Sequence, residues 1–345
     1  MNPLPKPELD PTPVFELFRG AHSTELLVAA SAHFKIFNLL ERPLSFNELK
    51  AGLNLQDRPL NVLLTALRAM NLLDFKDGLF VNSPMAVEHL ASTGLFDVSG
   101  YLSLAAQSAG VQQMIKCLES NQPIGSDKEE GAAFIFNDDI ESSAMDSEES
   151  ARFLTLALMG RAKNVAPFLA EAVDLSKCKM LLDVGGGTGI YSIAFLRQYE
   201  NLQATVLDHP NVLKLSAEYA QEYGVNTRLT CQPFDMFTSE FPKGDIILLS
   251  NILHDWDIPE NIKILKRCAA ALNSGEKLLI HDVFLNDELD GPLETALYSA
   301  SLFTFTQGRA YSVKEYTEML EQSGFKITAY ADTLVHCGVL TAEKV

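Results

Sequence analysis

The chain has 345 residues, of which 47% are apolar and 21% are charged, a composition typical of globular proteins rather than of disordered ones. Its net charge of −18 disfavours binding to the phosphate backbone of nucleic acids or to anionic membranes. The five cysteines are scattered without a C-x-x-C pair, which argues against a disulfide framework and a zinc site. We therefore expect a soluble, cytoplasmic protein without a metal, a nucleic-acid partner or a membrane partner.

The N-terminal part of the chain predicts a winged helix. Apolar residues at helical spacing predict a helix over residues 12–40. Ser45, followed by Glu48, is a capping-box start for a short helix, and a longer helix is expected over residues 58–73. The segment LLDFKDGLFVNS then predicts a hairpin that turns at Asp77-Gly78. Helix, turn, helix and hairpin occur in the order of a winged helix.

The second half of the chain predicts an α/β domain. Residues 84–165 have a mostly helical pattern, interrupted by a polar segment at 120–143 that we expect on the surface. From residue 166, helical segments alternate with unbroken apolar strands, which predicts a doubly wound parallel sheet covered on both faces. The expected strands lie in KMLLDVGGGTG, ATVLDHP, TRLTCQPFDMF, DIILLSN and EKLLIHDVFL. The predicted division is an N-terminal domain over 1–100, a helical linker over 101–165 and a Rossmann-like domain over 166–345.

The segment LLDVGGGTG, residues 181–189, stands at a strand-to-helix junction. Gly185, Gly187 and Gly189 allow a sharp turn and a close approach of the backbone to a ligand at the N-terminus of the next helix. The spacing is G-x-G-x-G and differs from the G-x-G-x-x-G of dinucleotide-binding folds. A glycine turn alone could also be an ordinary tight turn.

Two acids at the ends of the next strands support a ligand site. Asp208 can accept hydrogen bonds from the ribose hydroxyls of an adenosine, although it could instead cap the helix that Pro210 opens. Asp235 can accept from the adenine amino group, and Met236 and Phe237 offer flat apolar packing for the ring. The short glycine loop and the second acid favour S-adenosylmethionine over NAD as the adenosine-containing cofactor.

The motifs together resemble a known enzyme family. The series LLDVGGGTG, VLDHP, FDMF, SNILHDW, GEKLLIHDVFL and GRAYSVKEYTEMLEQSGF is similar to the winged-helix, dimeric, S-adenosylmethionine-dependent O-methyltransferases of the acetylserotonin, caffeate and antibiotic-tailoring type. The resemblance covers nearly the whole chain. It implies a homodimer formed through the N-terminal domain, S-adenosylmethionine as cofactor and a small hydroxylated aromatic or polyketide-like acceptor. It places Asp183 and Ser250 among the cofactor-binding residues.

The resemblance also assigns the catalytic residues. His254, at the end of the apolar run in DIILLSNILHDWD, matches the general base that takes the proton of the acceptor hydroxyl. Asp282 matches the acid that orients this histidine, although it is one carbon shorter than the usual glutamate. The competing interpretations are a structural histidine and a capping acid. Asp255 and Trp256 are expected to hold the loop, and His281 is expected to face the other side of its strand.

Two departures from the family pattern keep alternatives open. Ala310 stands where a second glutamate often flanks the base, and Ser250 stands where many plant members have a lysine. A less constrained base keeps a non-methylating reaction, hydroxylation or decarboxylation, as an alternative.

The acceptor pocket is expected between the domains, and core packing is the alternative for each of its proposed wall residues. These candidates are Met159, Asn251, Phe303 and Phe305. A ligand-sensing winged-helix regulator is a further alternative. The helix that would read DNA carries only Arg58 and Arg68 as cations, however, and a DNA reader needs a basic face.

Overall fold

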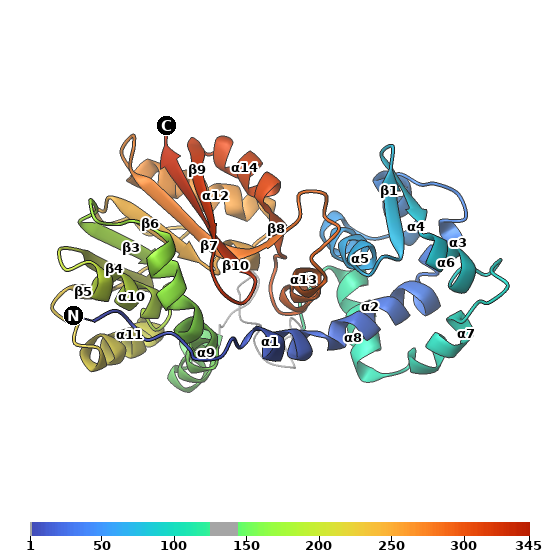
Figure 1. The fold of residues 1–345 in the computed structure, drawn as a ribbon, viewed down its shortest axis with the longest axis horizontal. Coiled ribbons are helices and arrows are strands. Elements are labelled where there is room, and N and C mark those ends of the chain that lie inside the picture. The colour runs from blue at the N-terminus through green and yellow to red at the C-terminus, as the bar shows by residue number, and fades with distance from the viewer. Residues whose placement is uncertain (1, 125–143) are drawn as a thin grey trace. The chain divides into compact units, whose positions relative to one another are not determined.

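The computed structural model describes residues 2–124 and 144–345, so most of the polar segment predicted over 120–143 lies outside the described residues. The described residues form two compact units (Figure 1). Residues 2–13, 144–284 and 313–345 form the first unit, and residues 14–124 and 285–312 form the second. Both units are discontinuous in sequence, so their limits differ from the three consecutive ranges 1–100, 101–165 and 166–345.

The first unit is built on one sheet with the strand order β5-β4-β3-β6-β7-β10-β9. The strands β3 to β7 run parallel, whereas β10 is antiparallel to both of its neighbours. Their bounds are β3 Met180–Val184, β4 Gln203–Asp208, β5 Leu229–Pro233, β6 Ile246–Ser250, β7 Lys277–Leu285, β9 Phe325–Asp332 and β10 Cys337–Lys344. The five parallel strands confirm the sequence prediction, whereas β9 and β10 were not predicted from the sequence.

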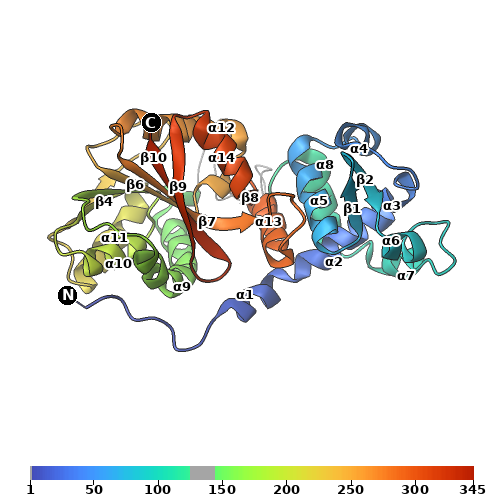
Figure 2. The same ribbon diagram turned by 45° about the horizontal axis from the view of Figure 1, so that its top comes forward.

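Helices cover both faces of this sheet (Figures 1 and 2). One face carries α9 Glu148–Ala172, α10 Ile190–Gln198 and α11 Pro210–Glu222, and the other carries α12 Ile258–Ala271 and α14 Val313–Glu321. Cover on both faces explains why β6 is apolar and buried along almost its whole length. Because the chain runs outward from β3 to β5 and then returns to β6, the direction reverses between β3 and β6. Ligands of doubly wound folds bind at such a reversal.

The second unit consists mainly of helices and contains one hairpin. Its elements, with the start of the first helix at the unit boundary, are α1 Thr12–Arg19, α2 Ala21–Val28, a π-helix at Ala29–His33, α3 Ile36–Leu39, α4 Phe46–Leu53, α5 Asp57–Ala69, β1 Leu73–Lys76, β2 Leu79–Asn82, α6 Pro84–His89, α7 Ser99–Leu102, a 3-10 helix at Ser103–Ala105, α8 Ala109–Ser120, α13 Leu293–Phe305 and β8 Tyr311–Ser312. Two further 3-10 helices, Ala144–Asp146 and Leu253–Asp255, belong to the first unit.

The predicted order of helix, helix and hairpin is present as α4, α5 and the β1-β2 hairpin. The capping box at the start of α4 is formed, with the Glu48 N–H donating to Ser45 Oγ at 3.3 Å. Asp77 and Gly78 both adopt positive φ, as a tight hairpin turn requires. The prediction of one unbroken helix over residues 12–40 is wrong, because the segment forms α1, α2, a π-helix and α3. One break lies at Lys35, which is left-handed at φ 50°.

The core of the second unit surrounds α5. Apolar residues of α5 pack with α2, α8 and α13, and all of them lie in one buried cluster. Residues of α13 in this cluster are Leu297, Ala300 and Phe303. A core that needs α13 explains why residues 285–312 belong with the N-terminal helices. The apolar face of α5 is therefore covered within its own unit and does not by itself require a partner chain.

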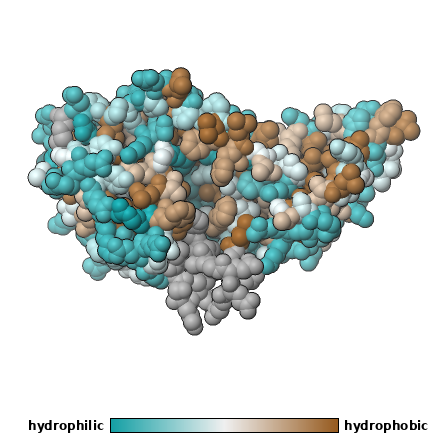
Figure 3. All heavy atoms as spheres, turned by 90° about the horizontal axis from the view of Figure 1, so that it is seen from below, coloured by the Kyte–Doolittle hydropathy of each residue, from teal (hydrophilic) through white to brown (hydrophobic). Residues whose placement is uncertain are grey.

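Other apolar side chains remain exposed in the second unit. Figure 3 shows patches of apolar surface, and Leu17 and Phe18 on α1 are both at least 80% exposed. Around α7, the exposed apolar residues are Leu95, Phe96, Val98, Tyr101 and Leu104. Patches of this kind mark interaction surfaces in many proteins. Among the described residues, no helix combines the length and apolar character that crossing a membrane requires.

Candidate active site

The glycine loop follows β3 and opens α10. Gly185, Gly187 and Gly189 all have positive φ, between 57° and 72°, which L-residues with side chains rarely adopt. A Cβ on Gly185 would lie 2.3 Å from the Cδ1 atom of Ile252 and 3.9 Å from the Cε atom of Met236. The loop is therefore shaped for glycine, and it lies against residues that follow β5 and β6.

Asp183 lies beneath this loop. Its side chain is fully buried, and Ser192 donates a hydrogen bond to Oδ2 at 2.7 Å. Among the described residues, no group donates to Oδ1. A Cβ on Gly186 would lie 2.7 Å from the carboxyl carbon of Asp183, so the carboxyl group fills the space under the loop. Burial raises the pKa of Asp183 to about 7.

Asp208 connects the end of β4 to the loop. Its Oδ2 accepts from the N–H of Gly187 at 2.8 Å, and its Oδ1 accepts from the N–H of His209 at 2.6 Å. Burial raises the pKa of Asp208 despite these hydrogen bonds. The N-cap of α11 is His209, so Asp208 does not have the alternative capping role. Each carboxylate oxygen retains acceptor capacity for a ribose hydroxyl.

Asp235, Met236 and Phe237 follow β5. Asp235 is exposed, and its carboxylate accepts from the Phe237 N–H at 2.8 Å and from the Thr238 hydroxyl at 2.6 Å. The ring of Phe237 packs edge-to-face on Trp256, with 4.8 Å between the ring centroids. The chain's one tryptophan thus supports the segment that follows β5, in addition to its own loop.

His254 stands in the 3-10 turn after β6 and is buried. Its Nδ1 lies 2.5 Å from Oδ1 of Asp282 on β7, and the same oxygen accepts from the Val283 N–H at 2.8 Å. Burial alone would lower the pKa of His254, but the carboxylates of Asp282 and Asp255 outweigh it and raise the pKa above its ordinary value of 6.5. For Asp282, burial opposes ionisation, whereas His254 stabilises the carboxylate, and the net effect is a lowered pKa.

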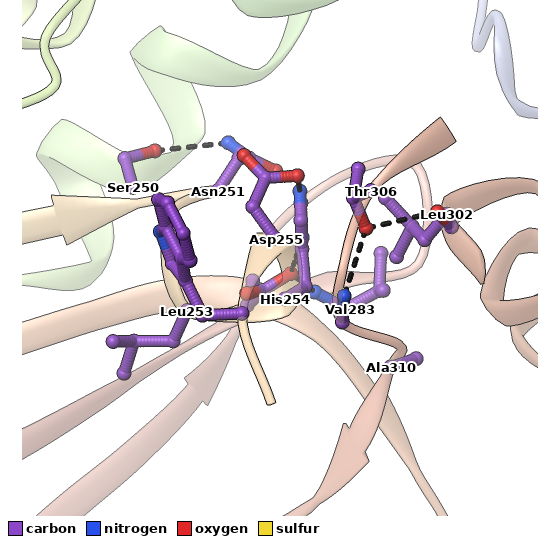
Figure 4. A network of polar contacts seen from close by, with 12 residues as sticks. Ser250, Asn251, Leu253, His254, Asp255, Val283, Leu302, Thr306 and Ala310 are labelled. Carbon is purple, nitrogen blue, oxygen red and sulfur yellow. Dashed lines mark hydrogen bonds and ion pairs between the residues drawn. The ribbon is translucent and has the colours of Figure 1, made fainter. Parts of the chain in front are cut away.

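Asp255 faces the other nitrogen of the same ring (Figure 4). Its Oδ1 lies 3.6 Å from Nε2 of His254, and burial raises the pKa of Asp255 to about 6. His254 therefore lies between two carboxylates. From the sequence, Asp255 was expected only to hold the loop. Its position directly after His254 was the available signal, but the sequence does not reveal to which side its carboxylate points.

A second polar network lies at the end of β6. The Ser250 hydroxyl lies 2.8 Å from Nδ1 of His281. The Asn251 amide donates to the Ser250 hydroxyl at 3.0 Å (Figure 4). The amide oxygen of Asn251 accepts from Arg161 at 2.7 Å. Burial lowers the pKa of His281 to about 3. These contacts occupy the polar groups of Ser250 and Asn251, and His281 contacts a different set of side chains from its neighbour Asp282.

The remaining predicted pocket residues differ in their surroundings. Met159 is buried on α9 in the first unit. Phe303 is completely buried in the core of the second unit, where the Arg58 guanidinium lies 4.8 Å from its ring centroid. Phe305, in contrast, is 44% exposed. Ala310 is buried, and its N–H donates to the Ser299 hydroxyl.

The doubly wound sheet, the glycine loop after β3, the acids at the end of β4 and after β5 and the buried histidine–aspartate pair define the class of S-adenosylmethionine-dependent methyltransferases. The sequence profile of the O-methyltransferase domain family matches residues 131–326. The chain belongs to this family and is an S-adenosylmethionine-dependent O-methyltransferase. The family resemblance, the fold class, the enzyme class and the cofactor predicted from the sequence are thereby confirmed.

Three similar proteins illustrate the relationship. A 3-hydroxy-5-methyl-1-naphthoate 3-O-methyltransferase of Streptomyces sahachiroi is 33% identical over 91% of this chain and 89% of its own length. An L-tyrosine C(3)-methyltransferase of Streptomyces lavendulae is 28% identical over 94% of this chain and 89% of its own length. The crystal structure of an O-methyltransferase family 2 protein from Planctomyces limnophilus, in complex with apigenin, is 42% identical with a TM-score of 0.90, and the match covers 100% of this chain and 99% of that one.

Proposed function

We propose that this protein methylates a phenolic hydroxyl of a multi-ring aromatic acceptor, with His254 as the general base. The observation that carries this proposal is the buried pair of His254, which follows β6, and Asp282, which lies on β7 just past the end of β6. Ile252, two residues before His254, lies against the glycine loop, so base and loop share one edge of the sheet. The relatives that act on a naphthoate or bind apigenin support a fused-ring phenol as the acceptor.

The residues of the first unit fit the cofactor. The glycine loop makes its sharp turn with positive φ at Gly185, Gly187 and Gly189, and Asp208 offers acceptor oxygens beside it. Asp235, Met236 and Phe237 are the proposed contacts of the adenine, with Asp183 supporting the loop from below and Ser250 at the end of β6. When bound, S-adenosylmethionine supplies an electrophilic methyl group on its sulfonium. The protein has to hold this group in line with the acceptor oxygen.

The proton of the acceptor hydroxyl is the second requirement. In the proposed step, neutral His254 takes this proton on Nε2, while its Nδ1–H remains hydrogen-bonded to Asp282. The imidazolium that forms lies between the carboxylates of Asp282 and Asp255, which stabilise its charge. Asp255 thereby supplies a second acid next to the base.

We further propose a homodimer formed through the second unit. The support is the set of exposed apolar residues on α1 and around α7. These side chains are exposed to water in a single chain, and an interface would bury them. All five cysteines are free thiols, which suits work in the cytoplasm. The naphthoate-methylating relative suggests a role in secondary metabolism.

The surroundings of α5 argue against the DNA-binding alternative. Arg58 donates to the backbone oxygens of Asn121, Thr306 and Gly308, and Arg68 donates to those of Glu288 and Leu289. Both guanidinium groups are thus committed to carbonyl groups of the same unit. Phosphate contacts need cations that are exposed on the recognition helix.

Product analysis tests the proposal. The purified protein, S-adenosylmethionine and apigenin or a hydroxynaphthoate should yield a product heavier by one methyl group, and NMR of that product should show an O-methyl group. The same acceptor with all hydroxyls already methylated is the control and should not react. A C-methylated or hydroxylated product, or no product from any phenol of this kind, would contradict the proposed reaction.

A further inference from the structure

Asp282 has a hydrogen-bond partner that the sequence analysis did not identify. The hydroxyl of Tyr316 donates to Oδ2 of Asp282 at 3.2 Å. The other oxygen, Oδ1, contacts Nδ1 of His254 and the Val283 N–H. The two oxygens of the carboxylate thus have different partners, and only one of them faces the histidine.

The ring of Tyr316 is held firmly in place. Tyr316 lies on α14 and is completely buried. Its ring packs edge-to-face on Phe284, with 5.5 Å between the centroids. Phe284 is two residues beyond Asp282 on β7, so both side chains leave the strand on the same face. Ring packing therefore sets the position of the hydroxyl that reaches Asp282.

We propose that Tyr316 is a positioning residue, which holds the carboxylate of Asp282 in the orientation that His254 requires. This inference rests on the proposed role of His254 as the base. A hydroxyl on Oδ2 and a backbone N–H on Oδ1 fix the plane of a short carboxylate that could otherwise rotate about its own bond. They leave the lone pair of Oδ1 directed at Nδ1.

The same hydrogen bond sets how strongly Asp282 attracts the proton of His254. Tyr316 shares the negative charge of the carboxylate. Its removal should therefore strengthen the pull of Asp282 on the imidazolium and raise the pKa of His254 further. The other charged groups that act on His254 are Asp255, which also raises its pKa, and Arg161 of α9, which lowers it.

Tyr330 provides a matched control on the same aromatic cluster. Its ring also packs edge-to-face on Phe284 at 5.5 Å, but its hydroxyl donates to Asp332 at 2.8 Å. Tyr316→Phe and Tyr330→Phe each remove one hydroxyl from a ring that touches Phe284. Only the first removes a hydrogen bond to the histidine–aspartate pair.

The experiment compares these two variants in the full chain. Tyr316→Phe should lower kcat about tenfold, the loss that roughly 1.4 kcal/mol would give. The KM for the acceptor and the affinity for S-adenosylhomocysteine should remain unchanged, and the acid limb of the pH profile should move to higher pH. Tyr330→Phe should match the parent enzyme in all of these. In an Asp282→Asn background, Tyr316→Phe should cause no further loss.

A measurement without turnover separates this inference from the proposed function. NMR of histidine-labelled protein gives the pKa of His254, whose signal is assigned by its absence in His254→Ala. A raised pKa in Tyr316→Phe supports the inference even if His254→Ala is still active, which would refute only the proposed base. An unchanged pKa together with an unchanged pH profile would overturn it. If Tyr316→Phe does not fold, 3-fluorotyrosine at position 316 alone replaces it. This stronger donor should lower the pKa of His254, and an unchanged value would again overturn the inference.

Discussion

At the scale of single residues, the surroundings of His254 decide when it can accept a proton. The carboxylates of Asp282 and Asp255 hold its pKa above 6.5, so the imidazole stays protonated at a pH where a free histidine is already neutral. A general base must be neutral before the reaction and charged after it. The same carboxylates that stabilise the protonated imidazole therefore limit the pH range in which the proposed base is neutral.

The first prediction concerns this base. His254→Ala should lower methyl transfer by roughly 10²–10⁴, in the lower part of that range, because the positioned proton acceptor is lost. Calorimetry should show an unchanged affinity for S-adenosylhomocysteine, since the imidazole acts on the acceptor.

The loss of methyl-transfer activity in His254→Ala should be smaller for acceptors that ionise unaided. Asp282→Asn should also lose less activity than His254→Ala. Parent activity should rise with pH through a value above 6.5 and then level off. A His254→Ala enzyme that methylates a weakly acidic phenol at the parent rate would return His254 to a structural role.

The second prediction concerns Asp183. Its pKa rises from 3.8 in the unfolded chain to about 7 in the folded one, so the folded state binds the proton more tightly. Protonated Asp183 therefore adds to the free energy of unfolding, and this contribution is fully present below about pH 4. It is lost as the pH rises towards 7, and the loss is on the order of 4 kcal/mol at most. Asp183→Asn cannot lose this contribution. The difference in melting temperature, variant minus parent, should therefore increase from pH 5 to pH 8. A constant difference over this range would show that Asp183 does not titrate there.

At the scale of elements, the turn from β3 into α10 depends on backbone that only glycine adopts easily. Gly185 combines positive φ with a close approach to Ile252. Gly224, at the end of α11, has a similar φ of 69° but nothing within 4 Å of a Cβ built on it. A side chain at either position would strain the backbone, but only a side chain at Gly185 would also crowd Ile252. Comparing the two positions therefore separates these two effects.

The third prediction compares these glycines. Gly185→Ala should weaken the binding of S-adenosylhomocysteine by about tenfold or more, because the new Cβ displaces Ile252 and the loop. Gly224→Ala should cost about 1 kcal/mol of stability through its left-handed backbone and leave the affinity unchanged. Calorimetry and thermal melting measure the two effects. Equal affinities of the two variants would mean that the loop tolerates a side chain and does not approach the cofactor closely.

At the scale of the whole molecule, the proposed dimer rests on the exposed apolar residues of the second unit. The fourth prediction is a homodimer at micromolar concentration, measured by sedimentation. Phe96→Glu combined with Leu104→Glu should shift it towards monomer, because charges are costly in a buried apolar interface. Leu158→Glu is the control: Leu158 is an exposed apolar residue on α9 of the first unit, and its change should leave the dimer intact. A parent chain that sediments as a stable monomer would contradict the proposal.

The sequence by itself determined those features that depend on local pattern. The strands β3 to β7, the capping box at Ser45 and the Asp77-Gly78 turn follow from residue spacing and turn chemistry over a few residues. The apolar run before His254 predicted that this histidine would lie at the carboxyl edge of the sheet, and the family resemblance predicted Asp282 as its partner. The three glycines also predicted the sharp turn of the loop, whose positive φ values the structure then gave.

Only the tertiary structure decided the contacts between distant segments. The strand β9 was not predicted from the sequence, and its antiparallel pairing with β10 depends on the completed sheet. The core around α5 needs α13, more than 200 residues further along the chain. Tyr316 meets Asp282 across 34 residues, because the packing of α14 on the sheet and of the Tyr316 ring on Phe284 places its hydroxyl there. The periodicity of a sequence predicts which face of its element a residue occupies. Which residue it contacts on that face depends on how the elements pack.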